Sequence, residues 1–384
     1  MVRSYQMNSL KAFCCAFLVV YSTLVIAQDS NKKWRLDGYI KEMISLTALQ
    51  DVDSLMFDNL IHNRLNVFWY PTEKLTLNME VRTRMFHGDA VKTIPSYGNF
   101  IDTNNDFFDF SYTEDFDQMV FHTMIDRLYL QWNDASWQLK VGRQRINWGV
   151  NLAWNPNDIF NAYSLYDFDY EERPGTDALR FQKFIGYAGG YEIAIKIADN
   201  WDEFTAAAMY KWNVKGYDLQ ALGGIMKNNL TAGVGWAGSI GWVGFKGESS
   251  YFYTLKKTDR NAWLTSLSLD YSLPNSLYFN ASVFYNSYAT QQGNVLSLNS
   301  GNSDVRSLTP YKWNAFLQTS YTFHPLFSGS LLTLVSPGNS GLFINPMFTF
   351  SPLNNFDLDL IGQIFLNKSS QNTSLAYLRL KYSF

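Results

Sequence analysis

Polar and apolar residues alternate along most of this chain with a period of two, which is the pattern of strands with one apolar and one polar face. The clearest case is the segment 75–85, where leucine, methionine and valine alternate with threonine, asparagine, glutamate and arginine. Segments of similar length and pattern follow at 61–70, 191–198, 204–214, 263–273, 277–288, 313–323 and 356–366. Segments of about ten residues with this alternation are typical of strands that cross a membrane in a barrel.

The last segment, 374–384, has the same alternation and ends on an aromatic residue. Its apolar face includes Leu378, Tyr382 and Phe384, and its polar face includes Arg379 and Lys381. This ending resembles the C-terminal signal by which bacterial outer-membrane barrels are recognised for assembly. We therefore expect Tyr382 and Phe384 to form an assembly signal, and this strand to close a barrel against the first strand.

Short and long connections alternate between the strands, as they do in outer-membrane barrels. The pattern predicts an all-β fold, a transmembrane antiparallel up-and-down β-barrel of about 18 strands with both termini in the periplasm. Sixteen strands are the alternative, because the glycine-rich run 221–247 can be divided in more than one way. The long connections, expected outside the cell, are 87–118, 149–177, 255–261, 289–310, 336–341 and 367–373.

The N-terminal segment has the pattern of a secretory signal peptide. Arg3 and Lys11 precede an apolar run over 12–26, and the small residue Ala27 ends it. We expect cleavage after Ala27, which leaves 28–384 as a single barrel domain in the cell outer membrane. Both cysteines of the chain lie in the removed segment, so the mature protein is expected to have no disulfide.

Composition supports a membrane barrel and argues against nucleic acid. Aromatic residues make up 17% of the chain, yet the mature part has no run near the ~18 apolar residues of a membrane helix. Removal of 1–27 takes the 31 basic residues to 29 against 34 acidic ones, a net charge of −5. The expected partners are outer-membrane lipid and lipopolysaccharide, the barrel-assembly machinery and small hydrophilic solutes, with no nucleic acid.

The strand that begins near Trp137 carries charges that break the simple alternation. Continued parity would aim Arg143 and Arg145 at lipid, at a cost of roughly 2 to 4 kcal/mol each near the midplane. A one-residue bulge at Gly142 would instead turn Arg143, Arg145 and Asn147 inward, and would place Ile146 and Trp148 on the outside.

The same region resembles a known group of barrels. Gly-Arg-Gln-Arg-Ile-Asn-Trp-Gly at 142–149, Asn-Pro-Asn-Asp at 155–158 and Arg-Pro-Gly-Thr-Asp-Ala-Leu-Arg at 173–180 are similar to a signature of porin-like outer-membrane families. These families include alginate-export-like and uncharacterised barrels. The resemblance implies that the 149–177 loop folds into the lumen, and it supplies no catalytic residue.

These patterns predict a porin-like channel for passive or selective passage of small hydrophilic solutes, constricted by the 149–177 loop. Basic lumen residues would form a wall opposite the acidic loop and create a field across the constriction. For each residue the alternative is an ordinary structural ion pair or a solvated charge. The predicted pore-lining and constriction residues are Arg82, Arg84, Lys140, Arg143, Arg145, Asn147, Asp158, Asp167, Asp169, Glu171, Glu172 and Arg180.

The sequence also bears on two other functions. A barrel that binds glycans on its surface, or takes part in polysaccharide export or assembly without conducting, is the alternative to a channel. An enzyme is not expected, because His87 beside Asp89 lacks a positioned nucleophile. No cofactor or metal is expected either, since Asp102, Asn104 and Asp106 begin a calcium-loop spacing but Phe107 replaces its turn glycine.

Overall fold

The computed structural model describes residues 33–49, 55–102, 106–162, 169, 172–290, 304–337, 341–366 and 372–384. The chain divides into a unit Met1–Arg35 and a unit Leu36–Phe384. The expected signal peptide, 1–27, lies outside the described residues. Among the residues that are described, no helix is long and apolar enough to cross a membrane.

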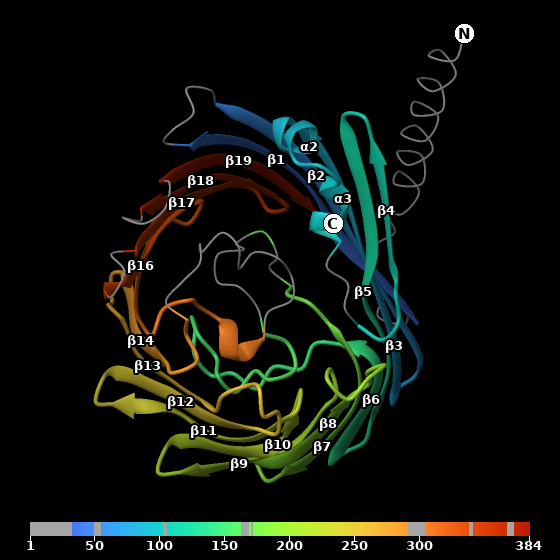
Figure 1. Ribbon diagram of the computed structural model, residues 1–384, viewed down its shortest axis with the longest axis vertical. Coiled ribbons are helices and arrows are strands. Elements are labelled where there is room, and N and C mark those ends of the chain that lie inside the picture. Colours follow the sequence, from blue (N-terminus) through green and yellow to red (C-terminus); the bar gives the residue numbers. More distant parts are fainter. Residues whose placement is uncertain are drawn as a thin grey trace. The chain divides into compact units, whose positions relative to one another are not determined.

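The described part of the chain forms one antiparallel sheet of 19 strands, with two five-residue helices, α2 (Asp89–Thr93) and α3 (Tyr97–Ile101) (Figure 1). The strands are β1 (Trp34–Leu49), β2 (Met56–Thr72), β3 (Leu75–Gly88), β4 (Ser111–Phe116), β5 (Met119–Asn133), β6 (Trp137–Gln144), β7 (Thr176–Ile185), β8 (Gly189–Lys196), β9 (Thr205–Val214), β10 (Tyr217–Met226), β11 (Asn229–Ile240), β12 (Val243–Thr254), β13 (Ala262–Ser272), β14 (Tyr278–Asn286), β15 (Trp313–His324), β16 (Phe327–Ser336), β17 (Gly341–Leu353), β18 (Phe356–Leu366) and β19 (Thr373–Ser383).

The sheet closes on itself, as the last segment predicts. β19 pairs with β1 from Tyr39↔Ser383 to Leu49↔Thr373. Beyond β19, the backbone N–H and C=O of Phe384 exchange hydrogen bonds of 3.0 and 3.1 Å with Gly38. The predicted closing strand and the closed antiparallel barrel are confirmed.

The closed ring contains 18 strands, because β4 is not one of its members. β4 pairs only with the first part of β5, from Ser111↔Met124 to Phe116↔Met119. The other edge of β5 pairs with β3, and the end of β5 pairs with β6, so β4 and β6 share one edge of β5. The predicted number of 18 is confirmed, and the expected loop 87–118 contains a short strand.

The glycine-rich run resolves into three strands joined by tight turns. β10 and β11 are linked by Lys227 and Asn228 alone, both with positive φ, 46° and 63°. Two successive residues with positive φ are typical of the two-residue turns that match the twist of a hairpin. This link lies at the barrel end that carries the long connections, so the expected alternation of short and long connections is wrong here.

Segments that leave the strands fill part of the barrel. Residues 145–162 (green) and the 3-10 helix η2 (Val305–Ser307, orange) lie inside the ring of strands (Figure 1). Their apolar side chains join inward residues of β7–β10 and β12–β18 in one buried cluster. Trp154, for example, stacks on Phe284 of β14 with ring centroids 5.3 Å apart.

The expected outward positions of Ile146 and Trp148 are wrong. Both side chains are buried in this cluster, and the Trp148 ring meets Phe160 edge-on at 5.0 Å. The cause is that β6 ends at Gln144. Residues beyond that point leave the ladder, so the parity of the strand no longer sets the direction of their side chains.

Candidate functional site

One side of the barrel interior carries a dense set of charged and histidine side chains. β1, β2, β3, β5 and β19 place these residues on the inward face because they follow the period-two alternation. Register aligns them in rows: His62 of β2 faces Arg84 of β3, which faces His122 of β5. The basic residues of this inner wall, all buried or half-buried, are Lys41, His62, Arg64, Arg82, Arg84, His122, Arg127 and Arg379.

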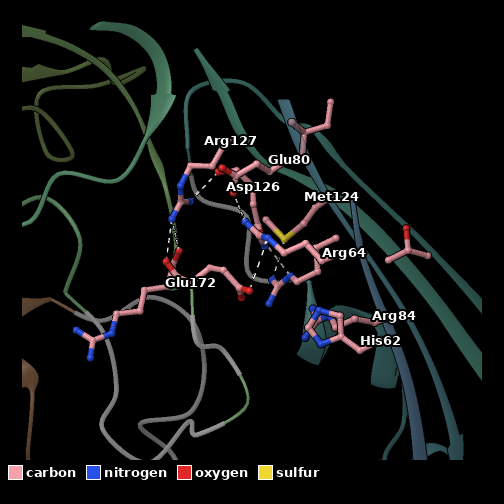
Figure 2. A network of polar contacts seen from close by, with 12 residues as sticks. His62, Arg64, Glu80, Arg84, Met124, Asp126, Arg127 and Glu172 are labelled. Atoms are coloured by element: carbon pink, nitrogen blue, oxygen red, sulfur yellow. Dashed lines mark hydrogen bonds and ion pairs between the residues drawn. The ribbon is translucent and has the colours of Figure 1, made fainter. Parts of the chain in front are cut away.

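Asp126 is the centre of a buried ion-pair network on this wall (Figure 2). Its carboxylate accepts a hydrogen bond from the Arg64 guanidinium, and the Arg82 Nε lies 3.6 Å away. Arg64 also pairs with Glu80 and lies 3.7 Å from Glu172. The guanidinium of Arg64, on β2, therefore links β3 and β5 to Glu172 in the connection between β6 and β7.

A β-bulge explains why Asp126 points inward beside Arg127. Glu80 pairs with Arg127 and Val81 with Ile125, so Asp126 is the extra residue of β5. A bulge places an additional side chain where simple alternation would not. The Arg127 guanidinium then donates to the carbonyls of Glu172 and Arg173, at 2.9 and 2.7 Å.

Asp169 makes a second contact between the connection and the wall. Its carboxylate lies 2.6 Å from Lys41 Nζ, 3.3 Å from His62 Nδ1 and 3.7 Å from the Arg379 guanidinium. Burial alone would raise the pKa of Asp169, but the His62 hydrogen bond and the charge of Lys41 lower it well below its usual range. Asp169 is therefore ionised at neutral pH.

The structure brings some of the predicted residues together on this wall. Arg82 contacts Asp126, and Arg84 donates to the Ile101 carbonyl at 3.2 Å. Glu172 meets the wall as described above. Asp167 and Glu171 lie outside the described residues.

Arg143 is buried, but the strand that carries it does not have the expected bulge. Its ladder with Leu128 of β5 and Asp177 of β7 continues across Gly142 without a register shift, so the expected bulge is wrong. The shift lies in β5 instead, and Gly142 only adopts a positive φ of 114°. Arg143 makes a two-pronged ion pair with Asp177, at 3.0 and 2.8 Å. This is the structural ion pair that the sequence analysis gives as the alternative to a pore-lining role.

The remaining predicted residues are spread over the inner surface. Lys140 stands 4.3 Å from the centre of the Tyr129 ring. Arg180 pairs with Glu192 of β8 at 2.6 Å. Asn147 is exposed and Arg145 is half-buried.

Residues 145–162 are called the inward segment below. Asp158 is fully buried among the apolar residues of this segment. One carboxylate oxygen, Oδ1, accepts a 3.3 Å hydrogen bond from the Trp148 N–H. Burial raises the pKa of Asp158 to about 7, against the opposing effects of the Arg145 charge and this hydrogen bond. Asp158 therefore does not join the acidic residues that face the basic wall.

Residues that could take part in enzymatic or calcium chemistry have local structural partners. Asp89 accepts from the Phe57 N–H and not from His87. Asp102 accepts hydrogen bonds from two hydroxyl groups of β4. Asp106 lies 3.3 Å from Lys196 Nζ, and Asn104 lies outside the described residues.

Several residues of the site were missed from the sequence. Parity within 61–70 could have placed His62 and Arg64 on the inner face beside Arg82 and Arg84. Lys41 lies in a strand with weaker alternation, and Asp126 points inward only because of the bulge. Glu248 of β12, buried against the inward segment, had no signal that distinguished it from other strand residues.

Solved structures of several bacterial outer-membrane proteins share this fold. OccK5 (OpdH) of Pseudomonas aeruginosa has a TM-score of 0.59 at 10% identity, with 92% of this chain and 98% of that chain covered. OccAB4 of Acinetobacter baumannii has a TM-score of 0.57 at 10% identity, with the same coverage. This is the fold of the Occ and Opd outer-membrane porins.

A third structure of this fold is OpdK of P. aeruginosa with vanillate, with a TM-score of 0.54 at 8% identity over 91% of this chain and 98% of that chain. No family model matches the sequence, and no curated protein matches it. At these identities the likeness concerns the course of the backbone. The side chains of the inner wall must be interpreted from this chain alone.

Proposed function

We propose that this protein is an outer-membrane channel for small hydrophilic solutes. In this proposal, segment 1–27 directs export, and Tyr382 and Phe384 present the barrel to the assembly machinery. Outer-membrane lipid and lipopolysaccharide then surround the barrel. The inward segment between β6 and β7 narrows the lumen, and solutes pass along the wall formed by β1, β2, β3, β5 and β19.

The observation that carries the proposal is the charged inner wall. Arginine, lysine and carboxylate side chains are costly inside a dry core, and they are abundant inside barrels that hold water. Within the described residues, the wall has Arg64, Arg82 and Asp126 at its centre, far from either end of their strands. A water-filled path beside this wall would account for their presence.

The chemistry of the wall favours small anions, in particular carboxylates. Lys41, His62, Arg64 and Arg379 face carboxylates that come from the connection between β6 and β7, at Asp169 and Glu172. A wall that binds carboxylates of its own chain has donors suited to a carboxylate of a solute. Vanillate, named with OpdK, is a small aromatic carboxylate and supports the same class.

Planar-bilayer recording tests the proposal. We expect discrete conductance steps from the purified barrel, a reversal potential that indicates preference for anions, and a smaller current when a small aromatic carboxylate is added. Heat-modifiable migration in the same preparation confirms that the barrel is folded. A folded barrel without conductance would contradict the channel and favour the glycan-binding or polysaccharide-assembly alternative.

An enzymatic role is not part of this proposal. The resemblance of 142–149, 155–158 and 173–180 to alginate-export-like families also stays a prediction. If purified protein showed phospholipase or protease activity that was lost in His87→Ala, the proposal would need a catalytic function as well.

A further inference from the structure

The side chain of Glu248, on β12, binds backbone N–H groups of the inward segment. Its side chain has 0% exposure. One carboxylate oxygen accepts from the N–H groups of Val150 and Asn151, the latter at 3.1 Å, and the other accepts from Asn157 at 2.9 Å. A single residue of β12 therefore satisfies three backbone donors of the segment that fills part of the lumen.

A second buried carboxyl lies beside this anchor. Asp158 follows Asn157 directly and is 1% exposed. Its Oδ1 accepts from the Trp148 N–H, whereas its buried Oδ2 has no hydrogen-bond partner. When both are ionised, Asp158 and Glu248 repel each other.

Other charges around Asp158 do not remove this repulsion. Arg145 and Arg173 act on Asp158 at a distance and favour its ionised form. From β8, Glu192 accepts from the Trp148 indole N–H and is itself paired with Arg180 of β7. The neighbouring strands therefore add one further acid, Glu192, together with its own cation, Arg180.

The hydrogen bonds decide which carboxyl holds the charge. Three donors converge on Glu248, an arrangement that stabilises a carboxylate. Asp158 receives one donor and leaves an oxygen unsatisfied, an arrangement that suits a protonated carboxyl. Two ionised carboxyls in an apolar cluster would be unfavourable, so the seated segment contains one charge and one proton.

We propose that Glu248 and Asp158 form a proton-controlled clasp that holds residues 145–162 against β12, and that this contact loosens when Asp158 ionises. Glu248 is thereby a positioning residue of the inward segment. The effect on the bore rests on the channel function proposed above, because a loosened segment would narrow the lumen less. The clasp itself does not require conduction.

The direction of the pH effect follows from the carboxyl that must ionise. The pKa of Asp158 is raised to about 7 in the seated state, whereas a free aspartate has a pKa near ~3.9. Between these values the seated state holds a proton that the released state loses. Rising pH therefore shifts the equilibrium between the seated and the released segment toward release, by up to about tenfold per pH unit across this window. Above the window the shift levels off.

Cysteine labelling can measure directly how often the inward segment is released. Ala153 is buried in the apolar cluster, and both native cysteines lie in the segment 1–27. The folded full barrel carrying Ala153→Cys is treated with a neutral, water-soluble maleimide over a range of pH. Its labelling rate is divided by that of Thr258→Cys, an exposed position outside the barrel strands, which cancels the pH dependence of the thiol itself.

We expect the relative labelling of Cys at 153 to rise several-fold as pH increases from acidic to neutral. Asp158→Asn, which keeps a neutral side chain, should make labelling slow and independent of pH. Glu248→Gln should speed labelling about tenfold at every pH, because it loses charge-assisted hydrogen bonds. Glu203→Gln, which changes a partly exposed acid paired with Lys227, serves as the matched control and should change nothing.

The outcomes separate the clasp from the channel. The clasp is refuted if labelling at 153 stays constant with pH, if Asp158→Asn keeps the pH dependence, or if folded Glu248→Gln labels no faster than Glu203→Gln. The pH series in the Ala153→Cys background tests the idea even if a charge variant fails to fold. A barrel that shows the labelling pattern but no conductance would retain the clasp and lose the proposed function.

Discussion

Replacement of Asp126 by asparagine is the sharpest test of the inner-wall network. Asp126→Asn preserves the size of the side chain and removes its negative charge. The variant leaves the Arg64 guanidinium facing a neutral amide at a site where both side chains are buried. Arg82, whose Nε lies 3.6 Å from the same oxygen, loses part of its compensation as well.

The magnitude follows from what Arg64 keeps. Removal of one partner of a buried ion pair costs about 3–5 kcal/mol, because the other charge stays buried without compensation. Arg64 still has Glu80, and Glu172 at 3.7 Å. We therefore expect a loss of unfolding free energy near the lower limit, about 3 kcal/mol.

Guanidinium unfolding of the barrel in lipid vesicles, followed by tryptophan fluorescence, measures this loss. A double-mutant cycle with Arg64→Gln isolates the pair, and the double variant should lose less than the sum of the single losses by at least ~1 kcal/mol. The matched control is Asp134→Asn, which breaks the exposed Lys74–Asp134 pair. Such surface pairs contribute about 0–1 kcal/mol.

Two results would refute the reasoning. If Asp126→Asn destabilised the barrel no more than Asp134→Asn, the network would not be buried as the structure has it. If the losses of the Asp126 and Arg64 variants added without coupling, the two side chains would not share an interaction.

Three further predictions concern the lumen and the barrel surface. Asp169→Asn with Glu172→Gln should shift the reversal potential in planar bilayers toward anion selectivity, because wall cations lose their compensating charges; an unchanged potential would show that these acids do not face the solute path. Tyr382→Asp should lower the yield of heat-modifiable barrel, because it puts a charge on the outward face of the closing strand, and an equal yield would argue against an assembly signal. Trp154→Ala should reduce unfolding free energy by about 3–5 kcal/mol, whereas Trp242→Ala, at a 91% exposed turn position, should change it little; equal effects would show that Trp154 is not part of a packed core.

Much of the barrel could be predicted from alternation alone. The strand 356–366 has the bounds that its pattern indicates, and β19 closes the sheet against β1. Alternation succeeds for these strands because one face is apolar and points outward while the other faces the interior, so a shift by one residue would reverse every side chain.

The candidate site was less predictable because its decisive features depend on contacts distant in sequence. The inward position of Asp126 depends on how β5 aligns with β3. The end of β6 at Gln144 depends on the burial of Trp148 and Trp154, and Trp154 packs against Phe284 and Phe316 of strands far along the chain. Parity describes a strand only while the ladder continues, so neither feature has a local signature.

The inward faces of the strands nonetheless contain a signal that divides the lumen. Inward residues of β8, β10, β12 and β14 include Ala194, Leu222, Phe252 and Phe284, all buried in the apolar cluster. Apolar side chains on the inside of a water-filled barrel would remain hydrated, and this loses the free energy gained by burial. They are stable only where something apolar covers them, as segment 145–162 does.

Charged inward faces require the opposite environment. On β2, β3 and β5 the inward residues include Arg64, Arg82 and Arg127, which can be stabilised by carboxylates, water or an ionic solute but not by an apolar cover. The composition of each inward face therefore indicates which part of the barrel interior is covered by apolar side chains and which part is matched by charged partners. In the proposed channel, the solute path must follow the charged strands, and the segment held by Glu248 sets how much of the remaining lumen stays closed.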